Sequence, residues 1–176
     1  MNERKIQLAI MSTMRGACLC ACPNYTPMNW WECDVWLVSK AGYVTEYEIK
    51  VSAADFRADR NKDRRVVKSG EWQDVNKHHE IGSDVGPSRF YYVVPKALAE
   101  LQAEIPEWAG FAVLRSDDDP RWGIRVLKDA PKLHTKKVRK REIELAKRRM
   151  WYRYWDALAS IENLVANVAG RERAGA

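Results

Sequence analysis

Residues 31–51, WECDVWLVSKAGYVTEYEIKV, decide the fold of this chain. Residues 33–38 and 43–51 are rich in aromatic and β-branched side chains, which are typical of β-strands. The Lys-Ala-Gly run at 40–42 predicts a three-residue hairpin loop between them, because glycine accepts the left-handed backbone conformation that the third loop position requires. The sequence therefore predicts an antiparallel hairpin.

The loop also predicts which residues of the hairpin face each other. Ser39 should face Tyr43, and counting outward places Asp34 opposite Glu48, with Cβ atoms about 5 Å apart. Because side chains alternate along a strand, Lys50 shares the face of Glu48. The hairpin is therefore expected to gather two carboxylates and an ammonium group on one side of the sheet.

Facing carboxylates repel one another, and Lys50 alone does not neutralise both. Mg²⁺ is usually held by one or two carboxylates with water and substrate phosphate, and it generates hydroxide from bound water. We therefore expect a Mg²⁺ site, at which Mn²⁺ can substitute, with Asp34 and Glu48 as ligands. Lys50 would orient the water or stabilise charge on phosphorus. The alternative is a solvated sheet face on which Glu46, Glu48 and Lys50 have no chemical role.

Several motifs resemble those of the PD-(D/E)xK nuclease superfamily. They are Asp34, the E-I-K triplet at 48–50, the D-F-R-A-D run at 55–59 and the F-Y-Y-V-V-P run at 90–95. The chain is similar, more narrowly, to the MmcB-like DNA-repair family and to related small phage-encoded proteins. Two features depart from the pattern: Cys33 stands where the superfamily name has proline, and residues 67–88 look like an added polar segment.

The resemblance implies an α/β protein with a restriction-endonuclease-like core, in which helices flank a mixed central sheet. It implies metal-dependent hydrolysis of DNA phosphodiester bonds in repair, recombination or phage DNA processing, with Asp34, Glu48 and Lys50 as catalytic residues. Glu32 and Glu3 are further candidate metal ligands, the first because it shares the strand face of Asp34, the second because the family often adds an acid from its first helix. The resemblance is compatible with a homodimer, because two DNA strands need two sites.

We expect residues 1–130 to form the nuclease-like domain and residues 131–176 to contribute a long basic C-terminal helix that packs on the same domain. The other elements follow from periodicity, capping and breaker residues. They are a helix at 2–14, a strand at 17–22, a helix at 52–67, a long polar loop at 69–88, a strand at 89–94, a helix at 95–104, strands at 111–114 and 122–127, and a last helix at 135–168.

Positive charge is concentrated towards the C-terminus. The net charge is +6, and residues 128–153 contain eleven Lys or Arg against three Asp or Glu. Such a segment is the electrostatic footprint of a polyanion, so we expect DNA as a partner; the alternative is a solvated helix face. The aromatic residues at 151, 152, 154 and 155 are expected to anchor this helix on the domain.

Candidate nucleic-acid contacts come from three segments. The arginines that follow the E-I-K triplet are expected on one helix face, where they can hold phosphate in a bidentate manner; the alternative is that they pair with Asp59, Asp63 or water. The polar loop and the basic C-terminal segment supply the others. The full set is Arg57, Arg60, Arg64, Lys77, His78, Lys136, Lys137, Lys140 and Arg141.

The cysteines and the termini limit the remaining interpretations. Cys18, Cys20 and Cys22 alternate, so we expect their sulfurs on one strand face, reduced and in or beside the core with Cys33; a metal or redox role is the alternative. There is no run of eighteen apolar residues and no secretory pattern, so we expect a cytoplasmic protein of a bacterial cell or phage-infected host, with no membrane partner.

Four functions compete on this sequence. The first is the Mg²⁺-dependent deoxyribonuclease, as an endonuclease or exonuclease. The second is a catalytically silent DNA-binding module of the same fold. The third is an RNA-directed nuclease with the same chemistry, and the fourth is a zinc or redox protein built around the cysteines.

Overall fold

The predicted acidic hairpin lies in the middle of a six-stranded sheet. The computed structural model describes residues 2–61, 63–68 and 71–174, without the side chains of residues 60, 64, 66–68 and 166–174. Its elements, in chain order, are α1 (Glu3–Met14), β1 (Cys18–Tyr25), β2 (Cys33–Ser39), β3 (Val44–Ile49), α2 (Ala53–Ala58), the 3-10 helix η1 (Asp59–Asn61), β4 (Asp63–Lys68), β5 (Glu71–Asn76), α3 (Lys77–Glu80), β6 (Arg89–Val94), the 3-10 helix η2 (Lys96–Glu104), β7 (Gly110–Leu114), the 3-10 helix η3 (Pro120–Trp122), β8 (Ile124–Lys128) and α4 (Lys140–Ala174).

The loop of the hairpin has the predicted geometry. Gly42 has a φ of +85°, and the Ser39 nitrogen donates a hydrogen bond to the Tyr43 oxygen at 2.9 Å. The pairing then continues to Val35 opposite Tyr47, which is the predicted register. The local signals of the turn and the strand alternation were therefore sufficient to align β2 with β3.

The sheet has the order β1-β2-β3-β6-β7-β8. Strand β3 runs parallel to β6, and β6 runs parallel to β7, whereas the other neighbours are antiparallel. The expected α/β class and mixed central sheet are confirmed.

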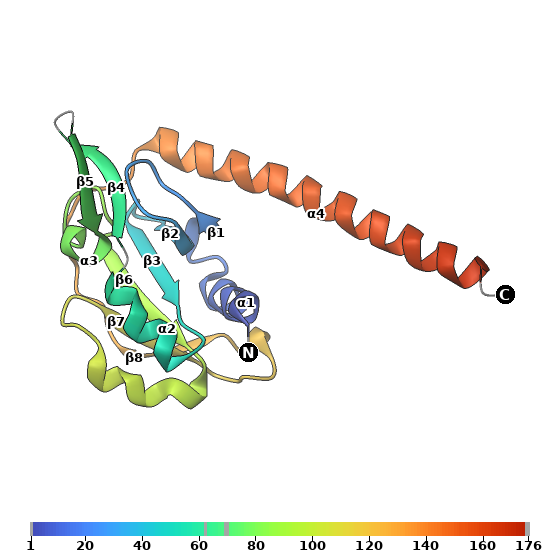
Figure 1. The fold of residues 1–176 in the computed structure, drawn as a ribbon, viewed down its shortest axis with the longest axis horizontal. Coiled ribbons are helices and arrows are strands. Elements are labelled where there is room, and N and C mark those ends of the chain that lie inside the picture. The colour runs from blue at the N-terminus through green and yellow to red at the C-terminus, as the bar shows by residue number, and fades with distance from the viewer. Residues whose placement is uncertain (1, 62, 69–70, 175–176) are drawn as a thin grey trace.

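Helices cover both faces of this sheet (Figure 1). On one face, Ile6 and Ile10 of α1 are buried against Val35, Tyr47 and neighbouring strand residues. On the other face, α2 and η2 cover a cluster that includes Phe56. A third apolar cluster joins β1 and β2 to the start of α4. The amphipathic helix predicted at 2–14 is confirmed, with Asn2 as its N-cap.

The helix predicted over residues 52–67 is wrong beyond its first turns. Ser52 caps α2 as predicted, but the helix ends at Ala58, and Asp63–Lys68 forms β4 instead. This strand pairs with β5, which comes from the segment predicted as a loop. Local periodicity missed the second sheet because each strand is defined by its partner rather than by its own pattern.

Smaller corrections concern where elements begin and end. Strand β1 continues through Pro23 to Tyr25, because β1 is an edge strand and proline is tolerated there. The segment at 96–104 is a 3-10 helix, and Trp122 precedes β8 in another 3-10 helix. The basic helix begins at Lys140, so the expected start at 135 is too early.

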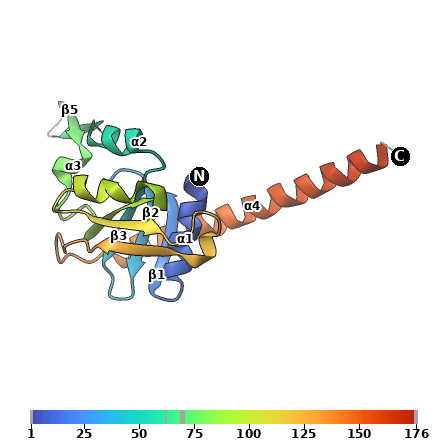
Figure 2. The ribbon, with the colours of Figure 1, turned by 90° about the horizontal axis from the view of Figure 1, so that it is seen from below.

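Helix α4 packs on the domain only through its first turns. Ile143 and Ala146 are buried, and the helix then projects well beyond the body of the molecule (Figures 1 and 2). The aromatic side chains at 151, 152, 154 and 155 are half or more exposed, so the expectation that they anchor the helix is wrong. In the part of the chain that the structure describes, no helix is both long enough and apolar enough to cross a membrane.

The three alternating cysteines do not share one face. A register shift between Cys18 and Cys20 places Cys18 against the α1-side core, while Cys20 and Cys22 pack beside the α4-side cluster. A β-bulge has this effect because one extra residue reverses the alternation. All four cysteines lie in the described part as free thiols in or beside the core, as the structural interpretation predicted.

Candidate functional site

The glutamate-bearing face of β3 is buried. Glu46, Glu48 and Lys50 are all at most 5% exposed, while Tyr47 and Ile49 point to the opposite face, into the α1-side core. The predicted alternation is confirmed. The alternative of a solvated sheet face is wrong, because α2, α3, η2 and the start of α4 enclose it.

Lys77 is the cation that lies between the two glutamates. Its Nζ is 2.6 Å from Oε1 of Glu46 and 2.6 Å from Oε2 of Glu48, and its side chain is fully buried. The contact between Lys77 and Glu46 Oε1 is an ion pair whose angles do not meet those of a hydrogen bond. Trp30 Nε1 donates a hydrogen bond to the other carboxylate oxygen of Glu46, Oε2, at 2.7 Å. Burial alone would lower the pKa of Lys77, but the charges of Glu46 and Glu48 outweigh it and raise that pKa.

Lys77 was predicted as a surface contact to nucleic acid, and this expectation does not fit its buried position. Its helix α3 begins at the Asn76 cap, directly after β5. Because β5 was predicted as a loop, no local pattern predicted that Lys77 would point into the protein. The resulting ion pairs also supply part of the charge compensation that sequence reasoning had assigned to a metal.

Lys50 links Glu48 to a third buried acid. Its Nζ donates to Glu48 Oε1 at 2.9 Å and to Asp59 Oδ1 at 2.6 Å. Burial lowers the pKa of Lys50, but the Glu48 and Asp59 carboxylates outweigh it and raise that pKa to about 12. Lys50 is therefore a permanent hydrogen-bond donor at neutral pH and is unsuited to act as a general base.

Three of the described side chains hold Asp59. Besides Lys50, the Tyr92 hydroxyl donates to Asp59 Oδ2 at 2.9 Å, and His78 Nε2 lies 2.9 Å from the same oxygen. Burial would raise the pKa of Asp59, but the hydrogen bonds from His78, Lys50 and Tyr92 lower it. The residue set predicted from the sequence omitted Asp59, although it ends the D-F-R-A-D run on which the resemblance rests.

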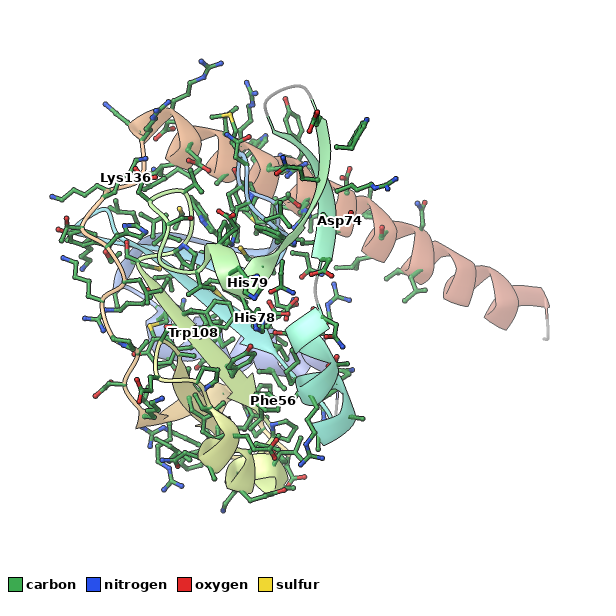
Figure 3. All side chains as sticks on the ribbon, turned by 60° about the vertical axis from the view of Figure 1, so that its left-hand side comes forward. Phe56, Asp74, His78, His79, Trp108 and Lys136 are labelled. Carbon is green, nitrogen blue, oxygen red and sulfur yellow. The ribbon has the colours of Figure 1, made fainter. Side chains whose placement is uncertain are left out.

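His78 is half-buried beside Trp108, with ring centroids 5.3 Å apart (Figure 3). His79 is exposed, so the adjacent histidines occupy different environments. His78 therefore belongs to the buried network, and its predicted role as a nucleic-acid contact stays a prediction.

Asp34 lies beside the E-I-K triplet. It is half-buried, and its Oδ2 accepts a hydrogen bond from the backbone nitrogen of Ile49 at 2.6 Å. Gln7 of α1 ties the same region to the first helix, because its Nε2 donates both to Glu3 Oε1 at 2.8 Å and to the Asp34 carbonyl at 3.1 Å. Glu32 is exposed just before β2. Of the two additional candidate ligands, Glu3 is thus linked to the backbone of Asp34 through the Gln7 side chain.

The donor chemistry of this region suits a hard cation. Among the side chains that the structure describes, the buried carboxylates of Glu46, Glu48 and Asp59 contact the ammonium groups of Lys50 and Lys77, and the Asp34 carboxylate lies at the backbone of Ile49, between Glu48 and Lys50 in the chain. Each carboxylate oxygen has two lone pairs, so the hydrogen bonds to Glu48 do not exhaust its ability to act as a ligand. Among the described residues, no group of three or more His, Cys, Asp or Glu side chains has metal-binding geometry. A site of two carboxylates completed by water remains within what Mg²⁺ accepts.

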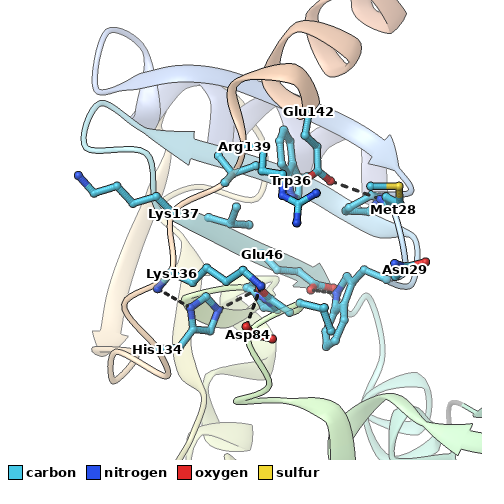
Figure 4. A pocket seen from close by; sticks show the side chains of 17 residues that line it. Met28, Asn29, Trp36, Glu46, Asp84, His134, Lys136, Lys137, Arg139 and Glu142 are labelled. Atoms are coloured by element: carbon cyan, nitrogen blue, oxygen red, sulfur yellow. Dashed lines mark hydrogen bonds and ion pairs between the residues drawn. The ribbon is translucent and has the colours of Figure 1, made fainter.

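A small pocket of about 150 Å³ opens beside the network, and Glu46 contributes to its wall (Figure 4). Trp30 and Trp36 provide aromatic surface, and three cationic residues, Lys136, Lys137 and Arg139, come from the segment that leads into α4. Lys136 pairs with Asp84 at 2.7 Å. The predicted basic contacts at 136 and 137 therefore lie next to the buried charges, in an extended segment rather than on the predicted helix.

A larger basic groove of about 560 Å³ runs along the start of α4. Its lining includes Arg139, Arg141, Arg148 and Arg149, with Arg149 5.6 Å from the centre of the Tyr25 ring. Arg148 and Arg149 were not in the predicted contact set, although the charge count of residues 128–153 included them. Tyr25 pairs with Cys33, which precedes Asp34, so one end of the groove is close in the sheet to the acidic hairpin.

The remaining predicted contacts are separated. Arg57 is exposed and makes a bidentate pair with Glu104. Residues 57, 60 and 64 lie on α2, η1 and β4, so the single helix face predicted for these arginines is wrong. The side chains of Arg60 and Arg64 are outside the described residues. Lys140 and Arg141 are exposed at the beginning of α4.

Comparison with known proteins shows a shared fold but gives no information on function. No protein-family model matches the chain, and no curated protein matches it. The solved structure of the SPO1766 protein of unknown function from Silicibacter pomeroyi is similar, with a TM-score of 0.55 and 15% sequence identity over 92% of each chain. At this identity the similarity shows a shared fold and nothing of the activity.

Proposed function

We propose that this protein is a metal-dependent nuclease that hydrolyses DNA phosphodiester bonds, on a restriction-endonuclease-like core. The observation that carries the proposal is the hydrogen bond from Ile49 to the Asp34 carboxylate, which fixes this acid next to Glu48 and Lys50. Asp34 and Glu48 supply the one or two carboxylates by which Mg²⁺ is usually held, with water and substrate phosphate as the remaining ligands. The position of the hairpin inside a mixed sheet flanked by helices agrees with the proposed core.

In this proposal Asp34 and Glu48 hold Mg²⁺ or Mn²⁺, with Glu3 and Glu32 as further candidate acids. The bound ion would polarise a phosphoryl oxygen and lower the pKa of bound water. Lys50 donates hydrogen bonds, orienting the water or stabilising negative charge on the phosphate. Asp59 and Lys77 position Lys50 and Glu48, because each forms an ion pair with one of them.

The basic groove along α4 is proposed to hold the DNA backbone. Four arginines line it, and guanidinium groups bind phosphate in a bidentate manner. Lys136 and Lys137 line the pocket beside Glu46 and extend the positive surface towards it, and Lys140 is exposed at the start of α4. Backbone contacts of this kind are independent of sequence and strongly salt-dependent.

The test is cleavage of supercoiled, single-stranded and branched DNA in Mg²⁺, in Mn²⁺ and in EDTA. The substitution Asp34→Asn removes the charge but keeps an oxygen that can accept from Ile49, so the hairpin should remain folded. We expect it to reduce cleavage on the order of a hundredfold or more. Asp118→Asn is the matched control, because Asp118 is an exposed acid in the loop between β7 and η3 and is not one of the proposed ligands. Undiminished cleavage by Asp34→Asn would refute this site.

A non-cutting DNA-binding module is the second candidate, and one observation favours it. Lys77 already stands between Glu46 and Glu48, so part of their repulsion is relieved without a metal. Direct measurement of Mn²⁺ binding by electron paramagnetic resonance separates the two candidates. A nuclease requires binding that Asp34→Asn weakens, whereas a silent module would bind DNA with no stoichiometric metal site.

A further inference from the structure

The projecting part of α4 carries an apolar seam with the spacing of a coiled coil. Trp151, Leu158 and Val165 are seven residues apart, and Tyr154 and Ile161 lie three residues after the first two. This 3-4 alternation is the a/d pattern by which α-helices pair. Apart from the half-buried Leu158, these side chains are 56% to 63% exposed.

The domain itself does not cover this seam. The contacts that fix α4 come from its earlier turns and from the first turn of the seam: Ile143 and Ala146 are buried, and Arg153, which is not a seam residue, donates to the carbonyl of Asn24 at 2.8 Å. Beyond them the helix leaves the body (Figure 2). The aromatic rings pack on one another along the helix, with Trp151 and Trp155 5.6 Å apart. A contiguous apolar surface of this kind marks an interaction site.

We propose that the seam is a self-association surface and that its occupant is α4 of a second copy of this chain, packed antiparallel. Every seam residue is apolar or aromatic, so the surface is complementary to itself, as a two-fold interface requires. An antiparallel register that aligns the two seams places Tyr154 opposite Val165 and Leu158 opposite Ile161 of the second copy. Each layer then joins a large side chain to a branched or smaller one.

The exposed area is adequate for a dimer. The seam and its flanking Trp155 and Leu164 expose apolar surface on the order of 700 Å² per copy, compared with about 800 Å² per partner in a standard interface. Tyr152 lies outside the seam and is not needed for this area. Interfaces of this size have dissociation constants from micromolar to picomolar, so the expectation for the full chain is set at the weak, micromolar end.

Charge and shape select the antiparallel orientation. Lys147, Arg148 and Arg149 lie just before the seam. A parallel pair would place these cations of both copies side by side, whereas an antiparallel pair separates them by about 35 Å, several times the Debye length of about 8 Å at physiological ionic strength. The domain sits at the same end of α4 as these cations (Figure 1). Antiparallel pairing thus also keeps the two domains apart.

Sedimentation equilibrium of the full chain, in nuclease-free buffer without DNA, tests the proposal. We expect a dimer at micromolar concentration and a dissociation constant at least a hundredfold weaker for the double substitution Leu158→Glu with Ile161→Glu. The matched control is Ala159→Glu with Asn163→Glu, which adds the same charges outside the seam and should remain dimeric. A wild-type chain that stays monomeric up to about 100 μM overturns the proposal, because a micromolar complex would be dimeric there.

A membrane surface is the other apolar partner that a basic helix of this kind could bind. Vesicles of phosphatidylcholine with phosphatidylserine provide that comparison. Vesicle binding by a chain that stays monomeric in solution overturns self-association, whereas a dimer that ignores vesicles supports it.

Cross-linking tests the orientation. Tyr154→Cys and Val165→Cys are made in a background where the half-buried Cys18 and Cys20 are replaced by serine. An antiparallel pair gives disulfides mainly between the two different variants when they are mixed. Disulfides formed mainly within each variant alone would overturn the antiparallel arrangement. None of these measurements depends on nuclease activity.

Discussion

The covered face of β3 and the projecting part of α4 reverse the usual distribution of side chains. Charged residues are buried on β3, where Glu46, Glu48 and Lys50 are enclosed, while large aromatic residues such as Trp151 and Trp155 are exposed on α4. Buried charges require partners within the same chain, and Lys77 and Asp59 supply them. A contiguous row of exposed apolar side chains indicates a partner from outside it. The first region is therefore a candidate for chemistry, and the second is a candidate for assembly.

Removing Lys77 should have the largest effect on stability. Lys77→Met leaves Glu46 and Glu48 buried without their shared cation, and breaking a buried ion pair costs about 3–5 kcal/mol. Urea denaturation measures this loss. Lys40→Met, an exposed lysine on the hairpin loop, should change stability by less than about 0.5 kcal/mol. Adding Glu46→Gln to Lys77→Met should recover part of the loss, because the two residues interact directly. A loss below about 1 kcal/mol for Lys77→Met, which is typical of an ordinary point mutation, would contradict a stabilising role for these ion pairs.

Asp59 should make the free energy of unfolding depend on pH in the acidic range. Its pKa is lowered below the ordinary value of 3.8, so its contribution is present above that pH and is lost as the pH falls through the lowered pKa. We expect Asp59→Asn to destabilise the protein by about 2–3 kcal/mol at neutral pH, because charged hydrogen bonds to Lys50 and Tyr92 weaken. The same variant should lose less additional stability below pH 4. Parallel pH curves for both proteins would contradict this assignment.

The indole of Trp30 should contribute a smaller amount. Trp30→Phe removes the hydrogen bond to Glu46 while leaving an aromatic ring in the cluster, and we expect a loss of about 2 kcal/mol. The measurement is thermal denaturation, and Trp36→Phe is the control, since Trp36 lies opposite Glu46 in the sheet. Equal losses for the two variants would attribute the effect to ring volume rather than to the hydrogen bond.

Replacing an exposed aromatic side chain of α4 by alanine should have the smallest effect on the stability of the folded domain. Trp151→Ala removes a large side chain that is 59% exposed, so in dilute solution, where monomers dominate, we expect a change within about 0.5 kcal/mol. The buried Trp36→Ala should cost about 3–5 kcal/mol in the same urea titration. A large loss for Trp151→Ala in monomers would mean that α4 folds back on the domain.

The acidic hairpin could be predicted from the sequence because its signals are local. The glycine-containing loop and the strand alternation determine the register, and the register brings Asp34 to the E-I-K triplet. The partners of Lys50 could not be predicted in this way. Asp59 is nine residues from Lys50, on η1, and Lys77 follows a strand that forms only by pairing with β4. Asp59 ends the D-F-R-A-D run, but neither residue has a local pattern that directs its side chain to β3.

The sequence by itself determined the amphipathic first helix, the hairpin and its register, and the concentration of positive charge near the C-terminus, because each depends on neighbours within a few residues. Only the tertiary structure decided that Glu46 and Glu48 are buried around Lys77, and that the aromatic residues of α4 lie away from the domain. Burial depends on which distant segments cover a surface, and no local pattern specifies those segments. For that reason the chemistry of individual residues could be anticipated, whereas their solvent exposure and ion-pair partners could not.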